Sequence, residues 1–389
     1  MRILGIIAEY DPFHRGHERH LRLARERVRP DFTYIALSGC FKQRGEPALL
    51  SPFDRAACAL EAGADAVFFL PTVWTVRDAE HYALGGVSLL QALGATHLAF
   101  GAEDGRTEPL EALAELLESP GGVLRGRLRE HLTSGRGYPS ALAAAVGEIR
   151  PELAPLLEKP NNTLAVCYLR AIRRLQAGLE PVPISRHGGY HADRIDPEEP
   201  SASALREALG RGSFAPVRAA VTEKSGEVLQ RAMLEGRLPR EERLDTLLIS
   251  RLRGMTPEEM RRLPDLSEGL EDRLREAARR VNTREELLNA VSTRRYPRAR
   301  ISRICAAALL GLTADGLAAE PLPRKAVLLG LRKNPEMTAL WREKGMIGPD
   351  WTEEADLRAW RIWSLCAGLP DTLPWTERTV TAKNPAKPL

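Results

Sequence analysis

The sequence has no closely spaced cysteines. Its five cysteines lie far apart and form no CxxC pair: Cys40, Cys58, Cys167, Cys305 and Cys366. This spacing argues against a structural zinc site or a disulfide framework, so we expect a protein of the reducing cytoplasm. Long apolar runs are also missing, since none reaches the roughly 18 residues of a membrane helix. The chain begins directly on a strand-like run, so we expect neither a signal peptide nor a membrane segment.

The common nucleotide-binding loops are absent too. Neither a Walker P-loop nor a GxGxxG motif occurs anywhere in the chain. The HExxH pattern of zinc helices is missing as well, because "HERH" is one residue short. Any nucleotide site must therefore use a different motif.

The composition is that of a folded globular protein, with 43% hydrophobic and 28% charged residues in a chain of 389. This length predicts two domains. Residues 1–200 carry 23 Lys and Arg against 26 Asp and Glu, whereas residues 201–389 carry 33 against 26. A basic C-terminal half is typical of proteins that bind polyanions, although a solvated arginine-rich surface would give the same counts.

Short apolar runs alternate with amphipathic helical patterns in the first half of the chain. The runs are "ILGIIAEY", "FTYIALSG", "AVFFLP", "HLAFG" and "VPISRHG". This alternation predicts parallel βαβ units in an α/β fold, where ligands bind beyond the carboxyl ends of the strands. From about residue 214 to 369 the pattern predicts helices and no strand.

These patterns divide the chain into three parts. We expect a catalytic domain over residues 1–212, with a mostly helical insertion at about 105–180. A basic helical domain should follow over residues 213–371. The last part, 372–389, is a polar, proline-rich tail that we expect to dock loosely or fray.

The stretch "YDPFHRGHERH" joins the first predicted strand to the first predicted helix. Pro12 stops the strand, and Gly16 lets the backbone pass close to a ligand. His14, His17 and His20 lie near a helix N-terminus, where free N–H groups and the helix dipole favour anions. Three interpretations are open: a metal site, ordinary loop and surface histidines, or a phosphate site. The position between strand and helix favours the phosphate site.

The tetrapeptide "HRGH" resembles the (H/T)xGH signature of the nucleotidyltransferase superfamily. "PSASALR" resembles the serine-rich turn of that superfamily, with Ser203 near the helix N-cap and Arg206 one turn further; a capping serine alone would also explain it.

Along most of its length the chain resembles the bacterial tRNA(Met) cytidine acetate ligase family. The matching stretches, in order, are "GIIAEYDPFHRGHERHL", "SGCFKQRGEPA", "GADAVFFLP", "AFGAEDG", "KPNNTLAVCYLRAI", "ISRHGGYHAD", "SASALREAL" and "TRRYPRARISRI". Asp11 and Cys40 stand where the family pattern has Asn.

The resemblance implies a Rossmann-like parallel sheet of the HxGH nucleotidyltransferase type, followed by a mostly helical C-terminal domain. It implies that acetate and ATP give acetyl-adenylate and pyrophosphate. The wobble cytidine of elongator tRNA(Met) then takes the acetyl group on N4, and AMP is released. ATP is the nucleotide substrate, and Mg²⁺ is expected with it. No metal site built by the protein and no obligate protein partner is expected.

We expect His14 and His17 to be the catalytic residues, because they can hold the phosphates while charge moves onto pyrophosphate. The backbone at the end of the first strand should line the adenosine. The full set expected around ATP is Ile7, Ala8, Glu9, Tyr10, Phe13, His14, Gly16, His17, His20, Gly101, Asn161, Asn162, Arg186, His187, Ser203 and Arg206.

For several residues of this set, the sequence gives a physical reason to expect them at ATP. Gly101 ends a strand and would permit close approach of the nucleotide. One of Asn161 and Asn162 is expected as a helix N-cap, and the resemblance places at least one of them at ATP. Arg186 and His187 follow a strand, where an arginine can bind phosphate.

Two further groups are expected to meet acetate or RNA. Lys42, Gln43 and Arg44 follow the second strand, where they would hold acetate or the anticodon, or simply form a polar turn. An arginine-rich run is expected to bind tRNA through phosphate forks and base stacking, or to be a solvated helix start. Its members are Arg294, Arg295, Arg298, Arg300 and Arg303.

Two other functions remain open from the sequence alone. One is an adenylyltransferase that joins a small phosphorylated metabolite to AMP, which would share "HRGH" but would not need a basic helical half. The other is a tRNA-binding protein whose nucleotide site only regulates binding.

Overall fold

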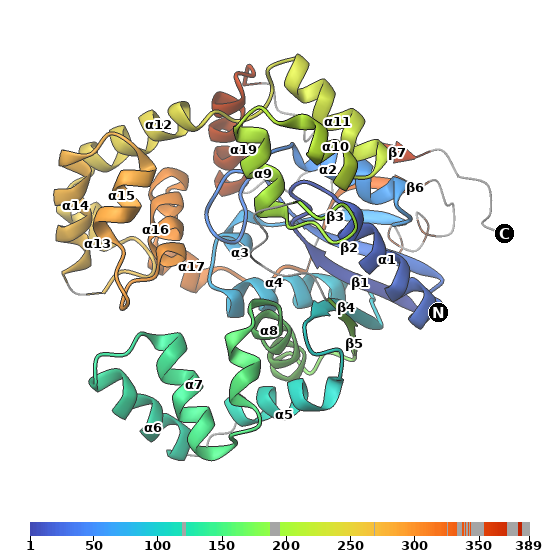
Figure 1. Ribbon diagram of the computed structural model, residues 1–389, viewed down its shortest axis with the longest axis horizontal. Coiled ribbons are helices and arrows are strands. Elements are labelled where there is room, and N and C mark those ends of the chain that lie inside the picture. The colour runs from blue at the N-terminus through green and yellow to red at the C-terminus, as the bar shows by residue number, and fades with distance from the viewer. Residues whose placement is uncertain are drawn as a thin grey trace.

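The five predicted strands of the first half lie side by side in one parallel sheet, as the alternation predicts (Figure 1). A computed structural model describes residues 1–118, 122–186, 195–267, 269–324, 326–332, 337, 339, 341, 343, 354–371 and 380–382. The strands are β1 (Ile3–Ala8), β2 (Phe32–Ser38), β3 (Ala66–Leu70), β4 (His97–Ala102), β5 (Glu180–Ser185), β6 (Val327–Arg332) and β7 (Val380–Ala382). Their order in the sheet is β5-β4-β1-β2-β3-β6-β7, and β1 to β5 pair in parallel.

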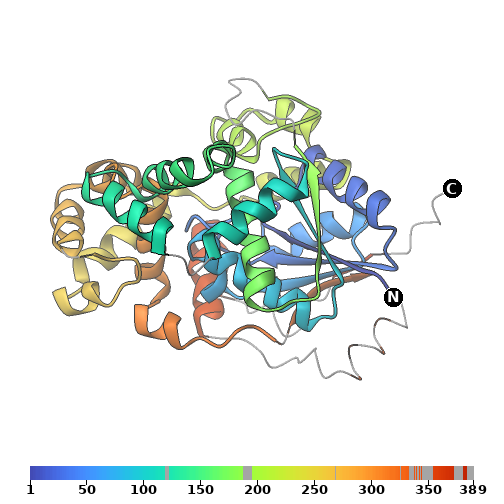
Figure 2. The same cartoon turned by 90° about the horizontal axis from the view of Figure 1, so that it is seen from below.

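Helices connect the parallel strands. In the first half they are α1 (Arg15–Val28), α2 (Pro52–Glu61), α3 (Thr72–Thr75), α4 (Ala79–Ala92), α5 (Thr107–Glu118), α6 (Gly122–Thr133), α7 (Tyr138–Ile149), the 3-10 helix η1 (Ala154–Glu158) and α8 (Pro160–Arg174). Right-handed crossovers place α1 and α2 on one face of the sheet and α4 on the other, where α4 packs against α8 (Figure 2). The central strands are buried on both sides and are accordingly apolar along most of their length.

The order in which the chain adds strands to the sheet reverses between β1 and β4. Strands β2 and β3 follow on one side of β1, whereas β4 and β5 lie on the other. At such a switch point the loops beyond the strand ends part from one another and leave room for a ligand. The histidine loop follows β1, and Gly101 lies at the end of β4, so both candidate elements meet at this position.

The second half is mostly helical, as predicted. Its helices are α9 (Ala202–Gly210), α10 (Phe214–Ala220), α11 (Glu223–Leu234), α12 (Glu241–Gly254), α13 (Pro257–Arg261), α14 (Leu270–Arg280), α15 (Arg284–Val291), α16 (Arg298–Leu310), α17 (Ala314–Ala319) and α19 (Glu354–Ala367). Helices α12 to α16 gather on the side of the sheet opposite the N-terminus (Figure 1). Within the described ranges no helix is long and apolar enough to cross a membrane.

The prediction of no strand between residues 214 and 369 is wrong. Strand β6 pairs antiparallel with β3, with Val67 opposite Gly330. The run "VLLGLR" is too short to show a period of its own, and it becomes a strand because the open edge of β3 supplies its backbone partners. Strand β7 then pairs with β6, so part of the tail expected to dock loosely belongs to the sheet.

Aromatic side chains attach the returning C-terminal segment to the first half of the chain. Trp341 is fully buried against Tyr34 and Phe68, with ring centroids 5.7 Å and 5.1 Å away. The indole N–H of Trp363 in α19 donates to the carbonyl oxygen of Ala48 at 2.6 Å. Trp341 and Trp363 therefore contribute to the core that surrounds the first strands of the sheet.

Candidate active site

His14 and His17 cap the start of α1 reciprocally. Nδ1 of His14 accepts from the backbone N–H of His17, and Nδ1 of His17 accepts from the backbone N–H of His14, each at 3.3 Å. The two rings stack, with centroids 3.5 Å apart and planes inclined by 20°. Because each Nδ1 is an acceptor, the proton of each neutral ring resides on Nε2. The motif thus presents two Nε2–H donors.

The histidines are neutral donors rather than cations. Burial lowers the pKa of His14 to about 3, helped by the positive charges of Arg186 and Arg206. Burial, with His14, Arg186 and His20 nearby, also lowers the pKa of His17 well below its usual value. Nε2 of His14 is buried and has no hydrogen-bond partner among the described residues. The positive charge beside the histidines comes from the two arginines.

Gly16 is required by the stacked histidines. A Cβ at this position would lie 3.1 Å from Cε1 and Nδ1 of the His14 ring, tighter than an ordinary contact. Tyr10 and Phe13 pack against the histidine pair. The centroid of the Tyr10 ring lies 4.9 Å from that of His17 and 4.8 Å from that of Phe13. Phe13 is fully buried, so the structure places its side chain behind His17 as packing.

His20 lies one turn further along α1. Burial lowers its pKa to about 4, a backbone hydrogen bond at Phe100 opposes this shift, and Arg186 adds to it. Nε2 of His20 is also buried without a partner among the described residues. The three histidines therefore share one environment. No group of three or more His, Cys, Asp or Glu side chains in the described ranges is arranged to hold a metal ion.

At the end of β4, a carboxylate performs the capping that we expected from an asparagine. Glu103 accepts hydrogen bonds from the backbone N–H of Asn161 at 3.2 Å and of Asn162 at 2.8 Å, and from Nδ2 of Asn161 at 2.6 Å. The N-cap residue of α8 is Lys159, whose side chain makes no capping bond. The prediction of an Asn N-cap is wrong, because both asparagines lie inside the first turn.

Asn162 and Gly101 face the switch point from the β4 side. Asn162 is fully buried, its Oδ1 accepts from the backbone N–H of Asp104 at 3.0 Å, and its Nδ2 has no partner among the described residues. A Cβ on Gly101 would meet nothing within 4 Å. Open space therefore lies beside Gly101.

Two arginines from segments later in the sequence border the site. Arg186 follows β5, and its backbone N–H donates to the carbonyl oxygen of Ala102 at 2.9 Å. Arg206 in α9 donates to the carbonyl oxygen of Asp11 at 2.7 Å and to Oγ of Ser203 at 3.3 Å. The expected neighbour His187 lies outside the described residues.

The N-cap of α9 differs by two residues from the expected position. Ser201 occupies it, and its Oγ accepts from the backbone N–H of Ala204 at 3.1 Å. Ser203 lies inside the first turn, where its hydroxyl is free to meet Arg206 instead.

The loop after β2 is largely committed to contacts within the chain. The Lys42 ammonium lies 2.8 Å from Glu46 and 3.3 Å from Asp11. Gln43 donates its backbone N–H to Glu9 Oε1 at 2.7 Å, and its side chain donates to a backbone carbonyl at 2.5 Å. Arg44 is exposed. Lys42 therefore belongs to an internal ion-pair network.

Arg55 is a structural residue of the site that sequence analysis missed. It is fully buried in α2 and donates to the carbonyl oxygens of Glu9 at 2.6 Å, Leu50 at 3.1 Å and Gly39, and to Ser38 Oγ at 3.3 Å. It thereby joins the carboxyl ends of β1 and β2. An arginine within the apolar pattern "RAACAL" was the signal for it.

Most of the arginine-rich run has partners within the chain. Arg298 bonds with Asn289 at 2.8 Å and with Glu285. Arg300 donates to the carbonyl oxygen of Asp265 at 2.6 Å, and Arg303 lies 3.5 Å from the Asp265 carboxylate. The remaining two, Arg294 and Arg295, are exposed.

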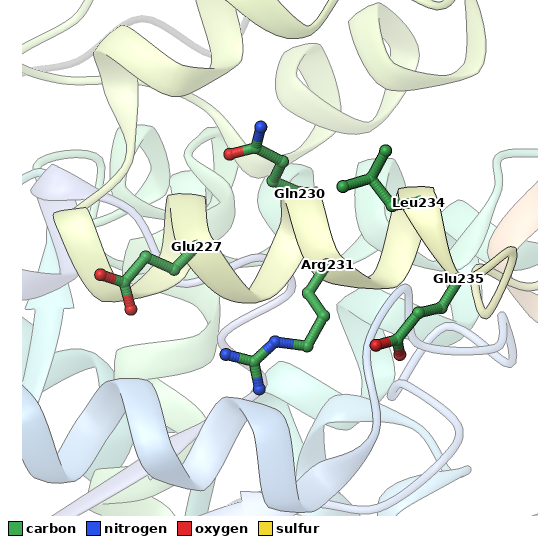
Figure 3. Close-up of a pocket in the computed structure, with 5 residues that line it drawn as sticks. All are labelled: Glu227, Gln230, Arg231, Leu234 and Glu235. Carbon is green, nitrogen blue, oxygen red and sulfur yellow. The ribbon is translucent and has the colours of Figure 1, made fainter.

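A surface hollow elsewhere is unrelated to this site. It is lined by Glu227, Gln230, Arg231, Leu234 and Glu235, which all come from α11 and its C-terminal cap (Figure 3). None of the expected site residues lines it.

A parallel sheet with a mutually capped histidine pair at its switch point is the arrangement that the resemblance to the nucleotidyltransferase superfamily implies. In agreement, residues 1–341 match the protein family described as HIGH Nucleotidyl Transferase. The tRNA(Met) cytidine acetate ligase of Acetivibrio thermocellus is 34% identical over 361 residues, which cover 89% of this chain and 87% of that protein. The enzyme of the same name from Syntrophotalea carbinolica is 36% identical over 398 residues, with 94% of each chain covered.

Solved structures agree with these relatives. Crystal structures of Thermotoga maritima TmcAL cover 98% of this chain and all of theirs. The form bound with alpha-thio ATP has 28% identity and a TM-score of 0.87. The apo form has 27% identity and a TM-score of 0.89. The chain belongs to the tRNA(Met) cytidine acetate ligase family.

Proposed function

We propose that this protein attaches acetate to N4 of the wobble cytidine of elongator tRNA(Met) and consumes ATP in doing so. The observation that carries the proposal is the pair of Nε2–H donors of His14 and His17 at the switch point, beside Arg186 and Arg206. Family membership supplies the acceptor and the acyl donor. Nε2 of His14, buried and without a partner among the described residues, supports a ligand with acceptor oxygens, as the phosphates of ATP have.

The first step forms acetyl-adenylate. An acetate oxygen attacks the α-phosphorus of ATP, the bond from that phosphorus to the bridging oxygen breaks, and pyrophosphate leaves with the electron pair. His14 and His17 donate to phosphate oxygens as negative charge moves onto the leaving group, and neutral imidazoles can do so without losing a proton. Arg186 and Arg206 supply the positive charge. Mg²⁺ would arrive on the triphosphate and share that charge.

The adenosine would occupy the space beside Gly101, where a Cβ would meet no protein atom. The backbone of Ile7, Ala8 and Glu9 borders this position at the end of β1. Asn162, whose Nδ2 has no partner in the described part of the chain, can donate to a ring nitrogen or a hydroxyl group of the nucleotide.

The second step transfers the acetyl group. The cytidine N4 attacks the carbonyl carbon, the bond from that carbon to the AMP oxygen breaks, and a proton leaves N4. The amine is a poor nucleophile, so most of the acceleration must come from orientation of the base, which has to leave the anticodon stack. We assign the binding of tRNA to the basic helical part within residues 213–371 and the reaction to the cytoplasm. In keeping with a reducing compartment, all five cysteines are free and buried.

One experiment tests this proposal directly. The protein is incubated with ATP, radiolabelled acetate and unmodified elongator tRNA(Met), and the digested RNA is analysed for N4-acetylcytidine. Label at that nucleoside, lost in a His17→Ala variant, is the expected result. ATP turnover with a phosphorylated metabolite and no label in RNA would favour an adenylyltransferase instead. RNA binding without acetate-dependent pyrophosphate release would favour a regulatory nucleotide site.

A further inference from the structure

The helical hairpin α6–α7 lies far from the N-terminus, on the same side of the molecule as α13 to α16 (Figure 1). The two helices pack against each other, and their connecting turn touches the segment that precedes α16. A Cβ on Gly137 would lie 2.4 Å from the carbonyl oxygen of Arg294, so only glycine permits this approach of the two backbones. The hairpin and the arginine-rich run therefore form one continuous surface.

The hairpin is basic although the first half of the chain is acidic. Residues 122–150 contain five arginines and two glutamates. Arg125 and Arg129 are four residues apart and share one face of α6, and Arg136 lies in the turn. All three are exposed, and their side chains have no hydrogen bond or ion pair among the described residues. Arg127, by contrast, is paired with Glu130 and Glu148.

Apolar and aromatic side chains accompany these arginines. Of the six large hydrophobic residues that are exposed in the described part of the chain, three belong to this hairpin: Val123, Leu132 and Tyr138. Tyr138 is 56% exposed and stands two residues after Arg136. Arginine forks bind phosphates, and an exposed aromatic ring can stack on a base. Exposed arginines beside an exposed tyrosine fit an RNA, whose phosphates and base faces match the two kinds of side chain.

The segment that precedes α16 also carries exposed arginines beside an aromatic ring. Arg294 is exposed with no side-chain partner among the described residues, and Arg295 lies over the ring of Tyr296, 5.5 Å from its centroid. The surface also lies near the reaction. Helix α16 meets the loop after β2, since a Cβ on Gly45 would be 2.7 Å from the carbonyl oxygen of Ser302.

We propose that the α6–α7 hairpin, together with Arg294 and Arg295, binds the sugar-phosphate backbone of the tRNA. This inference rests on the proposed function, and it adds to the expected arginine-rich run a second arm that belongs to the catalytic half. Two segments from distant parts of the sequence then hold the RNA beside the carboxyl ends of the strands.

The test compares two triple variants with equal charge. One replaces Arg125, Arg129 and Arg136 by Gln. The control replaces Arg2, Arg22 and Arg29, which are also exposed. They belong to the first residues of the chain, to α1 and to its C-cap, at the other end of the molecule (Figure 1). Binding of an elongator tRNA(Met) transcript is measured over a series of salt concentrations. Acetate-dependent ATP–pyrophosphate exchange, which needs no RNA, reports that each variant is folded.

Loss of three phosphate contacts should reduce the slope of log affinity against log salt by about 2 to 3 units. We expect at least a tenfold loss of affinity at moderate salt for the hairpin variant, and less than a twofold change for the control. Equal slopes for the two variants would overturn the inference. A change in self-association with unaltered RNA binding would also overturn it and make the surface a protein interface. Failure of the proposed function would be evident earlier, in a wild-type protein that acetylates no RNA.

Discussion

Lys42 and Asp11 form an ion pair of 3.3 Å in which the side chains are only 4% and 1% exposed. Asp11 also accepts from the backbone N–H of Leu49 at 2.6 Å and lies 3.8 Å from Arg206. The pair connects the histidine loop to the loop after β2. Position 11 is where the resemblance leads us to expect asparagine, and the aspartate found here places a buried charge beside Lys42.

The first prediction follows from this pair. Lys42→Met would leave the Asp11 carboxylate buried without its nearest cation, and we expect the free energy of unfolding to fall by about 3–5 kcal/mol. Adding Asp11→Asn removes the stranded Asp11 charge and should restore part of the loss, since Glu46 still lacks its contact with Lys42. Urea denaturation of the wild type, both single variants and the double variant measures the coupling. A double variant no more stable than Lys42→Met would show that the pair has no such coupling.

Glu46 gives this network a pH dependence. Burial alone would raise the pKa of Glu46, but the Lys42 ammonium, with Arg284 and Arg206, outweighs burial and lowers that pKa to about 2. The folded state therefore keeps Glu46 ionised below its unfolded pKa of about 4.3. Its stabilisation is present above that value and is lost as pH falls towards 2.

The second prediction separates the capping role of His14 from its chemical role. Asparagine is a good N-cap, and its side-chain oxygen can accept from the backbone N–H of His17 as Nδ1 of His14 does. It lacks the Nε2–H donor. For His14→Asn we expect stability within about 1 kcal/mol of the wild type and a fall in pyrophosphate exchange of about 10²–10³-fold. His14→Ala is the comparison, since it should lose the cap as well as the activity. Full exchange by His14→Asn would remove His14 from the reaction.

The sequence predicted well what depends on neighbouring residues. The five apolar runs become β1 to β5, and "HRGH" lies between strand and helix as the alternation requires. Contacts between distant segments were not predictable in this way. Glu103 provides the helix cap that we expected from an asparagine, although it lies 58 residues from Asn161 in the sequence. Likewise, β6 is a strand only because β3 has an open edge. The neutrality of the histidines depends on burial and on two arginines that the fold brings to them.

The third prediction concerns Gly101. Its added Cβ would meet no protein atom within 4 Å, so Gly101→Ala should leave the unfolding midpoint unchanged. If the nucleotide fills that space, the methyl group will collide with it, and we expect at least a tenfold loss of ATP affinity, about 1.4 kcal/mol. Gly178→Ala is the matched control, because a Cβ there is equally unobstructed. Calorimetric titration with ATP measures the affinity of both variants. Equal ATP affinities of Gly101→Ala and Gly178→Ala would place the nucleotide elsewhere.

The fourth prediction uses the buried Asp356 of α19, whose Oδ1 accepts from the backbone N–H of Thr72 at 2.8 Å. Burial raises the pKa of Asp356 to about 7, whereas the hydrogen bond to Thr72 opposes this shift. An unfolded aspartate has a pKa of about 3.9. Between these values the folded state holds a proton that the unfolded state releases, so the resulting stability is complete below about pH 4 and disappears as pH rises through 7.

Asp356→Asn keeps an acceptor for Thr72 and cannot ionise. We therefore expect the stability of the variant relative to that of the wild type to increase from pH 5 to pH 8. The increase should be about 2–3 kcal/mol, since the two pH units of linkage between pH 5 and pH 7 are worth about 2.7 kcal/mol. Urea denaturation at both pH values measures this difference, and every other titrating group cancels between the two proteins. A difference that is the same at pH 5 and pH 8 would mean that the Asp356 carboxylate is already ionised in the folded protein at pH 5, and that the contact between α19 and α3 tolerates its charge.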